Sequence, residues 1–180
     1  MSKQIHTITA SEEAALLKDF YQANGDIAFG YRHHRNLTCL LLMLDAGLRV
    51  GEVCKLQRSD ICFNGLVAEG VKVRALISKN KQERSVPLSG RLRVCLTGLT
   101  EYWQHSQGNE SWPVIATHQY DSAQITTRQV QRWLKDFSLQ QTGRAVNPHS
   151  LRHTFATKLM RVLNIRGVQE LLAISGSPPQ

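Results

Sequence analysis

The segment from Leu37 to Leu44 constrains the fold of this chain more than any other part of the sequence. Its residues, Leu-Thr-Cys-Leu-Leu-Leu-Met-Leu, are apolar on nearly every side that a helix would present. A helix without a polar face must be buried, so the sequence predicts a central helix over about 33–46. Gly47 follows at once and is typical of a helix C-terminus.

The rest of the sequence predicts further helices and a few short strands. Thr9 and Glu12 form a capping box, which predicts a helix that runs to about Tyr21. Periodic apolar residues predict helices over 50–56, 89–105, 127–141, 148–163 and 167–172, and β-branched runs predict strands over 66–68, 71–77 and 84–86. We therefore expect a mainly helical α+β fold with one small antiparallel sheet.

The length and charge of the chain narrow the classes of function. Its 180 residues fit a single domain, and 22 Lys and Arg against 14 Asp and Glu give a net charge of +8. This balance favours a nucleic-acid partner over an anionic membrane surface. The polar N-terminus has no signal-peptide pattern, and the apolar run is too short to cross a bilayer. We expect a cytoplasmic protein with no membrane partner.

The four cysteines, Cys39, Cys54, Cys62 and Cys95, show no CxxC spacing. Three of them, all except Cys62, have apolar neighbours in the sequence. Buried free thiols are therefore expected in place of disulfides or a zinc site.

A concentration of cationic side chains begins at Asn147. Asn147 suits the N-cap of a helix and Pro148 its first position. His149, Arg152 and His153 then share one helix face. A helix start of this kind is either a phosphate site or a solvated basic surface, and the stretch alone does not decide between them.

Arg49 also has two possible interpretations, one structural and one functional. It directly follows the predicted buried helix and its Gly47 turn, and Glu52 stands three residues further on. The pair fits a local ion pair on a short helix. An arginine directly after a buried helix is also a candidate for a functional role.

Four motifs, in this order along the chain, together resemble the tyrosine recombinases, or phage integrases. They are Gly47-Leu48-Arg49-Val50-Gly51-Glu52-Val53, the lysine-bearing hairpin from Ser78 to Leu88, His149-Ser150-Leu151-Arg152-His153-Thr154-Phe155-Ala156-Thr157, and Val168-Gln169-Glu170-Leu171-Leu172. The resemblance covers about 9–172 of a single domain over 1–180, and 173–180 form an atypical tail. It implies the catalytic domain of a site-specific DNA recombinase.

The resemblance implies roles for the matched residues. Arg49 and Arg152 would clamp the scissile phosphate of a double-stranded DNA site and offset the charge of the transition state. Lys79 would be the general acid that protonates the leaving 5′ oxygen. His149 would assist proton transfer or donate a hydrogen bond to the phosphate.

Four further residues have weaker assignments by the same resemblance. Glu52 would support the site from behind the arginines, and His153 would be structural. Lys81 and Arg84 would contact the DNA backbone or belong to a solvated face. A tyrosine would form a 3′-phosphotyrosyl intermediate, and the family's reaction needs neither a metal nor another cofactor.

The C-terminal tail departs from the family pattern. The family continues with Gly-His or Gly-Trp and then the nucleophilic tyrosine, whereas this chain continues as Ala173-Ile174-Ser175-Gly176. All four tyrosines precede Arg152. A one-nucleotide deletion after Leu172 would explain the tail, as would a truncation with an unrelated end. The chain is expected to bind DNA and not to cleave it alone.

The start of the chain also differs from many integrases. Only about thirty residues precede the predicted buried helix, so no N-terminal core-binding domain is expected. Short family members and separated catalytic domains would look alike here. Two alternatives stay open: a non-catalytic DNA-binding remnant or regulator, and a protomer that receives its tyrosine from a partner recombinase. We expect a monomer or a weak dimer.

Overall fold

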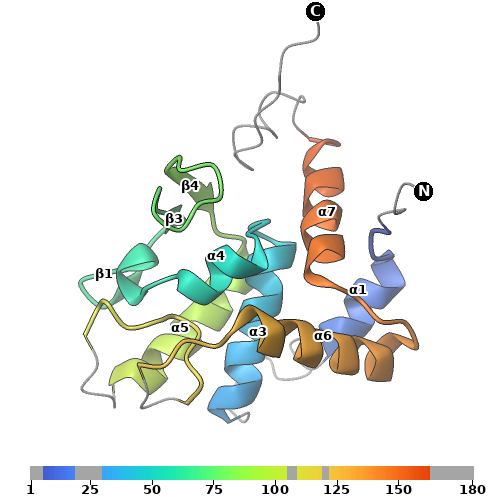
Figure 1. The fold of residues 1–180 in the computed structure, drawn as a ribbon, viewed down its shortest axis with the longest axis horizontal. Coiled ribbons are helices and arrows are strands. Elements are labelled where there is room, and N and C mark those ends of the chain that lie inside the picture. Colours follow the sequence, from blue (N-terminus) through green and yellow to red (C-terminus); the bar gives the residue numbers. More distant parts are fainter. Residues whose placement is uncertain (1–5, 19–29, 105–108, 119–121, 163–180) are drawn as a thin grey trace, which may run out of the picture.

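The computed structural model describes residues 6–18, 30–104, 109–118 and 122–162 (Figure 1). Helices dominate, and two small antiparallel sheets lie at one side. The elements are α1 (Ala10–Leu16), α3 (Tyr31–Leu44), α4 (Val50–Lys55), the 3-10 helix η1 (Arg58–Asp60), β1 (Cys62–Phe63), β2 (Leu66–Val67), β3 (Gly70–Val73), β4 (Arg84–Pro87), α5 (Gly90–Gln104), α6 (Thr127–Thr142) and α7 (Pro148–Leu159). The predicted fold class is confirmed.

Helix α3 forms the centre of the domain, as its apolar sequence predicts (Figure 1). Its residues 40–44 have no exposed surface, and the helix packs against both α5 and α7. Burial of this many large side chains is the main favourable contribution to folding. Gly47 ends the segment with φ 61, a left-handed conformation that glycine adopts without strain.

The sheets differ from the predicted arrangement. The described residues form two separate hairpins, β1–β2 and β3–β4, and β1 was not predicted. A two-residue strand is too short to show the alternation of polar and apolar residues that predicts a strand. The Asn64-Gly65 turn that follows β1, with φ 51 and 77, is nevertheless a known hairpin signal. Strand β3 ends at Val73, because a turn in which Ile77 N donates to Arg74 O (3.1 Å) replaces the predicted continuation.

Three of the cysteines confirm the thiol prediction. Cys39, Cys54 and Cys95 are buried and free, and Cys62 is half-buried and also free. Burial raises the pKa of Cys54 to about 11 and that of Cys95 to about 12. These thiols therefore stay protonated and act as small apolar residues.

Helix α1 and the residues just before it contact α6, α7 and the connection between these two helices. The predicted capping box is present, with Thr9 N donating to Glu12 Oε2 at 2.7 Å. Glu12 also accepts two hydrogen bonds from Arg144, which lower the pKa of Glu12 to about 2. Ile8 N donates to Thr154 Oγ1 of α7 at 2.9 Å. The docked N-terminal segment thereby holds α7 in place.

Several predictions lie wholly or partly beyond the described residues: the end of the first helix near Tyr21, the last residue of the helices over 89–105 and 148–163, the helix and motif over 167–172, and the tail over 173–180. In the part of the chain that the structure describes, no helix is both long and apolar enough to cross a membrane.

The contact between α3 and α5 gives a stability prediction. A Cβ atom at Gly98 would lie 2.5 Å from ring atoms of His34, whereas one at Gly51 in α4 would meet nothing within 4 Å. We expect Gly98→Ala to lower the free energy of unfolding by about 1–2 kcal/mol through overpacking. Gly51→Ala should raise it by about 0.5–1 kcal/mol through helix propensity. Urea unfolding measures both, and an equal effect at the two positions would contradict the packing described.

Candidate functional site

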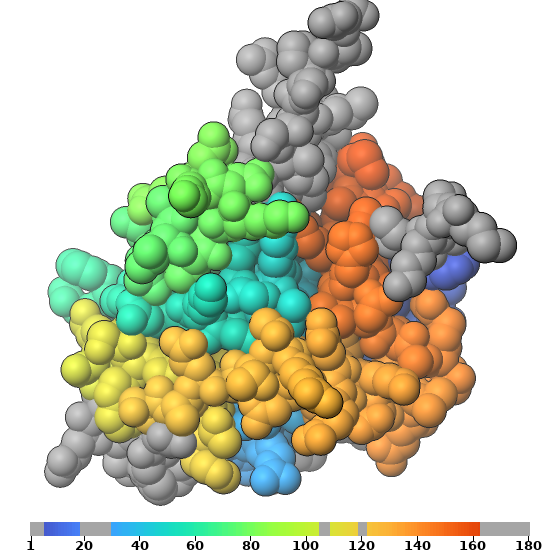
Figure 2. Space-filling view, in the orientation of Figure 1, coloured from blue at the N-terminus to red at the C-terminus, as the bar shows by residue number. Residues whose placement is uncertain are grey.

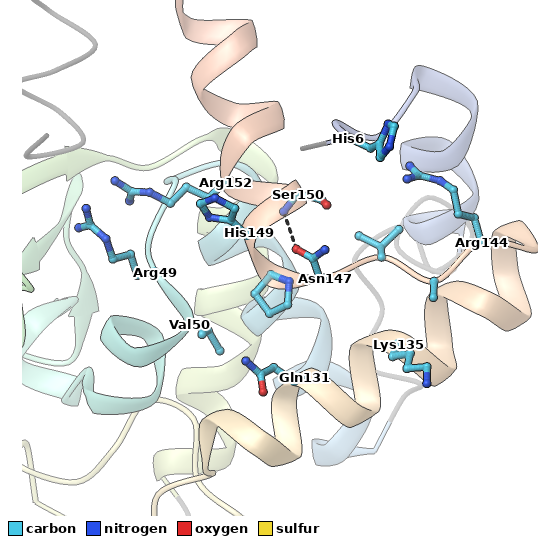
Figure 3. A pocket seen from close by; sticks show the side chains of 13 residues that line it. His6, Arg49, Val50, Gln131, Lys135, Arg144, Asn147, His149, Ser150 and Arg152 are labelled. Atoms are coloured by element: carbon cyan, nitrogen blue, oxygen red, sulfur yellow. Dashed lines mark hydrogen bonds between the residues drawn. The ribbon is translucent and has the colours of Figure 1, made fainter. Parts of the chain in front are cut away.

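The first turn of α7 carries two of the candidate residues. Asn147 is the N-cap, and its side-chain oxygen accepts a hydrogen bond from Ser150 N at 2.9 Å, with Pro148 at the first helical position. This start was predicted from the sequence. It places His149 and Arg152 one turn apart on the side of α7 that faces Arg49 (Figure 3).

Arg152 is held against the turn that follows α3. Its side chain is 7% exposed, and Nη1 donates a hydrogen bond to Gly47 O. Burial and, after it, the charge of Arg49 lower the pKa of Arg152 to about 10. The guanidinium therefore remains protonated at neutral pH, in surroundings that favour the approach of an anion.

Arg49 is the N-cap of α4 and is fixed by Glu52. Glu52 accepts a hydrogen bond from Arg49 N at 2.8 Å and one from Nη1 at 3.2 Å. The local ion pair suggested by the sequence is therefore present, but it engages only part of the guanidinium, which stays 27% exposed. Arg49 can hold its position and still offer hydrogen-bond donors to a ligand.

Arg84 was expected to contact DNA or to lie on a solvated face, and the structure contradicts this. Residues alternate between buried and exposed along β4, so Arg84 points inward together with Val86. Only 8% of Arg84 is exposed, and its two Nη atoms donate to the Glu52 carboxylate at 3.1 and 2.7 Å. The direction of the Arg84 side chain follows from the alternation of side chains between the two faces of β4.

The charge state of Glu52 follows from these neighbours. Burial is the largest influence on its pKa and raises it. Hydrogen bonds from Arg84 and from the backbone of Arg49, with the charges of both arginines, outweigh burial and lower the pKa overall. Glu52 is therefore an ionised carboxylate inside the protein, 2% exposed, between two guanidinium groups.

Lys79 and Lys81 lie on the connection between β3 and β4, and both are exposed. Neither is among the residues that line the cavity beside the arginines. Lys81 adopts a left-handed conformation, with φ 54, at the turn closed by Lys81 N and Ser78 O at 3.1 Å. The structure thus brings Arg49, His149 and Arg152 together at one cavity. The two lysines lie outside that cavity, on the exposed connection between β3 and β4.

His149 and His153 are in direct contact on α7. Their Nε2 atoms are 3.0 Å apart, and the rings meet edge to face. One ring donates a hydrogen bond to the other, so at least one of the two must be neutral. Burial, the charge of His149 and the charge of Arg152, in that order, lower the pKa of His153. A neutral His153 can therefore fix the orientation of the His149 ring.

A cavity of about 690 Å³ adjoins these groups, where α4, α6 and α7 meet (Figures 2 and 3). Its lining consists of His6, Arg49, Val50, Gln131, Lys135, Arg144, Ala145, Val146, Asn147, Pro148, His149, Ser150 and Arg152. Four residues of this lining with long polar or charged side chains were not predicted from the sequence: His6, Gln131, Lys135 and Arg144. The positions of Gln131 and Lys135, four apart on the polar face of the predicted helix, were the available signal.

The lining of this cavity is cationic. It contains three arginines and a lysine, and no described carboxylate lines it. Among the residues that the structure describes, no three histidine, cysteine or acidic side chains are placed to hold a metal ion. Arginine donors of this kind recognise phosphate oxygens with defined geometry.

The sequence profile described as the "Phage integrase family" matches residues 7–175. The chain belongs to the phage integrase family. It is similar to tyrosine recombinase XerA of Thermococcus onnurineus, with 31% identity over 142 residues that cover 78% of this chain and 47% of that protein. It is also similar to tyrosine recombinase XerC of Xylella fastidiosa, with 30% identity over 173 residues that cover 94% of this chain and 53% of that protein.

Solved structures share the fold of this integrase-family chain. The crystal structure of XerA recombinase matches with a TM-score of 0.74 at 20% identity, over 98% of this chain and 56% of that one. The XerH recombinase bound to its difH substrate matches with a TM-score of 0.72 at 17% identity, over 98% of this chain and 49% of that one. The fold is that of a tyrosine recombinase catalytic domain. The chain spans about half the length of the curated relatives it matches.

The histidine pair of this integrase-family site gives a titration prediction. Because the folded protein favours neutral His153, its pKa should lie below the ordinary value of 6.5. In His149→Gln it should rise, since one repelling charge is gone, but stay below 6.5, since burial remains. Stability contributed by neutral His153 is present above pH 6.5 and is lost as the pH falls below it. NMR titration of the imidazole signals measures this, and a pKa above 6.5 would contradict the burial described.

Proposed function

We propose that this chain binds double-stranded DNA and clamps one phosphodiester for site-specific strand cleavage and rejoining. The observation that carries the proposal is the convergence of Arg49, His149 and Arg152 on one cationic cavity. Relatives named tyrosine recombinases support it. So do neighbours of the same fold whose structures contain DNA, among them the Tn1549 transposon integrase with circular intermediate DNA and a lambda integrase dimer on a core site.

In this proposal the two arginines stabilise the transition state. Arg49 and Arg152 donate to the non-bridging oxygens of the phosphate, where negative charge accumulates during attack. His149 donates to the same phosphate or assists proton transfer, and His153 sets the orientation of its ring. Glu52 holds Arg49 in place, so that little reorganisation is needed when DNA arrives.

The bond changes balance without a cofactor. A tyrosine hydroxyl attacks the phosphorus and passes its proton to His149, the bond to the 5′ oxygen breaks, and Lys79 supplies a proton to that oxygen. The phosphate ester is preserved in the 3′-phosphotyrosyl link, so rejoining runs the same steps in reverse. The exposed connection that carries Lys79 and Lys81 lies over the DNA in this scheme, with Lys81, Gln131 and Lys135 beside the flanking backbone.

The attacking tyrosine is the group that this sequence does not supply after Arg152. In this proposal the phosphate clamp alone accounts for DNA binding, and the protein acts in the cytoplasm. This observation also favours a second function, in which the chain occupies recombination sites as a regulator, or receives a tyrosine from another recombinase protomer.

Salt titration tests the DNA-binding part. The logarithm of the association constant for a duplex should fall linearly with the logarithm of salt concentration, as counterions are released. Arg49→Gln and Arg152→Gln should each weaken binding and reduce the slope by about 1. Fluorescence anisotropy between 50 and 200 mM NaCl is the measurement, with Arg32→Gln on α3 outside the cavity as the control. Binding that does not depend on salt would contradict the proposal.

A nicked suicide duplex carrying the recombination site tests the cleavage part. This chain alone should form no covalent DNA adduct on a denaturing gel, because no tyrosine follows Arg152. Addition of a full recombinase protomer that has the tyrosine but lacks the arginine clamp should give an adduct if the tyrosine is donated in trans. An adduct formed by this chain alone would show that another residue attacks the phosphate.

A further inference from the structure

A buried ion pair joins the β3–β4 hairpin to the helix that Arg49 begins. Arg84 and Glu52 have side chains 5% and 2% exposed, and two hydrogen bonds connect them, from Nη1 to Oε1 at 3.1 Å and from Nη2 to Oε2 at 2.7 Å. Two parallel bonds of this kind fix the carboxylate in plane and in rotation. A single lysine contact would leave it free to turn.

The same carboxylate fixes Arg49. Oε2 accepts the Arg49 backbone N–H at 2.8 Å, and Oε1 accepts Nη1 at 3.2 Å. Each oxygen of Glu52 therefore has one bond to Arg84 and one to Arg49. Any rotation of the carboxylate would break bonds to both, so the orientation of Arg49 depends on Arg84 through Glu52.

Arg84 is itself firmly placed. It lies opposite Val73 in the β3–β4 ladder, and its side chain faces the core side of the hairpin. Buried ion pairs contribute little to stability compared with apolar residues of the same size, because desolvation of both charges offsets their attraction. The main effect of the Arg84–Glu52 pair is therefore to fix the geometry of the adjacent site.

We propose that Arg84 is a positioning residue, which acts through Glu52 to hold the Arg49 guanidinium in the orientation that receives a phosphate. This role rests on the proposed function, in which Arg49 binds the DNA phosphate. Arg84 itself contacts no substrate. Loss of Arg84 would displace the Arg49 guanidinium, which does contact the phosphate in this proposal.

The test compares two arginine-to-lysine substitutions in the same hairpin. Arg84→Lys keeps the charge but cannot make both bonds to Glu52. Arg74→Lys is the matched control: Arg74 Nε contacts the buried carboxylate of Asp60 at 2.7 Å, and that carboxylate is bonded to Gln57 N and not to Arg49. The readout is the NMR signal of the Arg49 Nε–H group, in the free protein and during titration with inorganic phosphate.

We expect the Arg49 signal of wild type to shift with phosphate in a saturable manner. Arg84→Lys should move that signal in the free protein and weaken phosphate binding by about tenfold, within the range for coupled neighbours. In Arg49→Lys the further change Arg84→Lys should have no additional effect on binding. Arg74→Lys should alter neither the signal nor the affinity, even if it lowers the melting temperature.

An Arg49 signal and a phosphate affinity that are the same in Arg84→Lys and Arg74→Lys would overturn the positioning role. If Arg84→Lys does not fold, Glu52→Gln tests the same link from the other partner, and an unchanged Arg49 signal there would overturn it equally. A wild-type Arg49 signal that ignores phosphate would instead refute the proposed function. The free-protein signals would still decide whether Arg84 positions Arg49.

Discussion

The ionised carboxylate of Glu52 is the group on which the candidate site depends. Arg49 and Arg84 lie close enough to Arg152 that, after burial, their charges lower the pKa of Arg152, and the charge of Glu52 raises it. Without the carboxylate, three guanidinium groups would repel one another at the surface of a buried core. With it, Arg49 is fixed by two hydrogen bonds while its free donors still face the cavity.

The apolar core explains how residues far apart in the sequence reach this carboxylate. The second half of α3, from Thr38 to Leu44, is buried, and Gly47 turns the chain sharply after the helix, which brings Arg49 out at the surface. Helix α7 packs against α3, so Arg152 lies beside the same turn and donates to Gly47 O. Arg49 and Arg152 are thus both held near the C-terminal end of α3, and their separation follows from the packing of apolar side chains.

The sequence predicted some parts of this arrangement well and others poorly, for physical reasons. The buried helix, the Thr9 capping box and the Asn147 N-cap depend on local residues, and they were predicted close to their observed positions. The inward direction of Arg84 was not, because a charge in a short strand is usually exposed, and only the tertiary position of Glu52 makes burial favourable. The same holds for Gln131 and Lys135, whose part in the cavity depends on how α6 lies against α7. The connection that carries Lys79 and Lys81 was recognised from its sequence motif. Its position relative to the arginines depends on how the β3–β4 hairpin packs, which the motif does not show.

In the proposed function, Arg49 and Arg152 form one phosphate site. A crystal structure of this chain bound to a DNA duplex tests it most directly. We expect a backbone phosphate within hydrogen-bond distance of both guanidinium groups, in the cavity beside His149, with the Glu52 carboxylate still bonded to Arg84. A complex in which the DNA lies on another face, with no phosphate at either arginine, would contradict it.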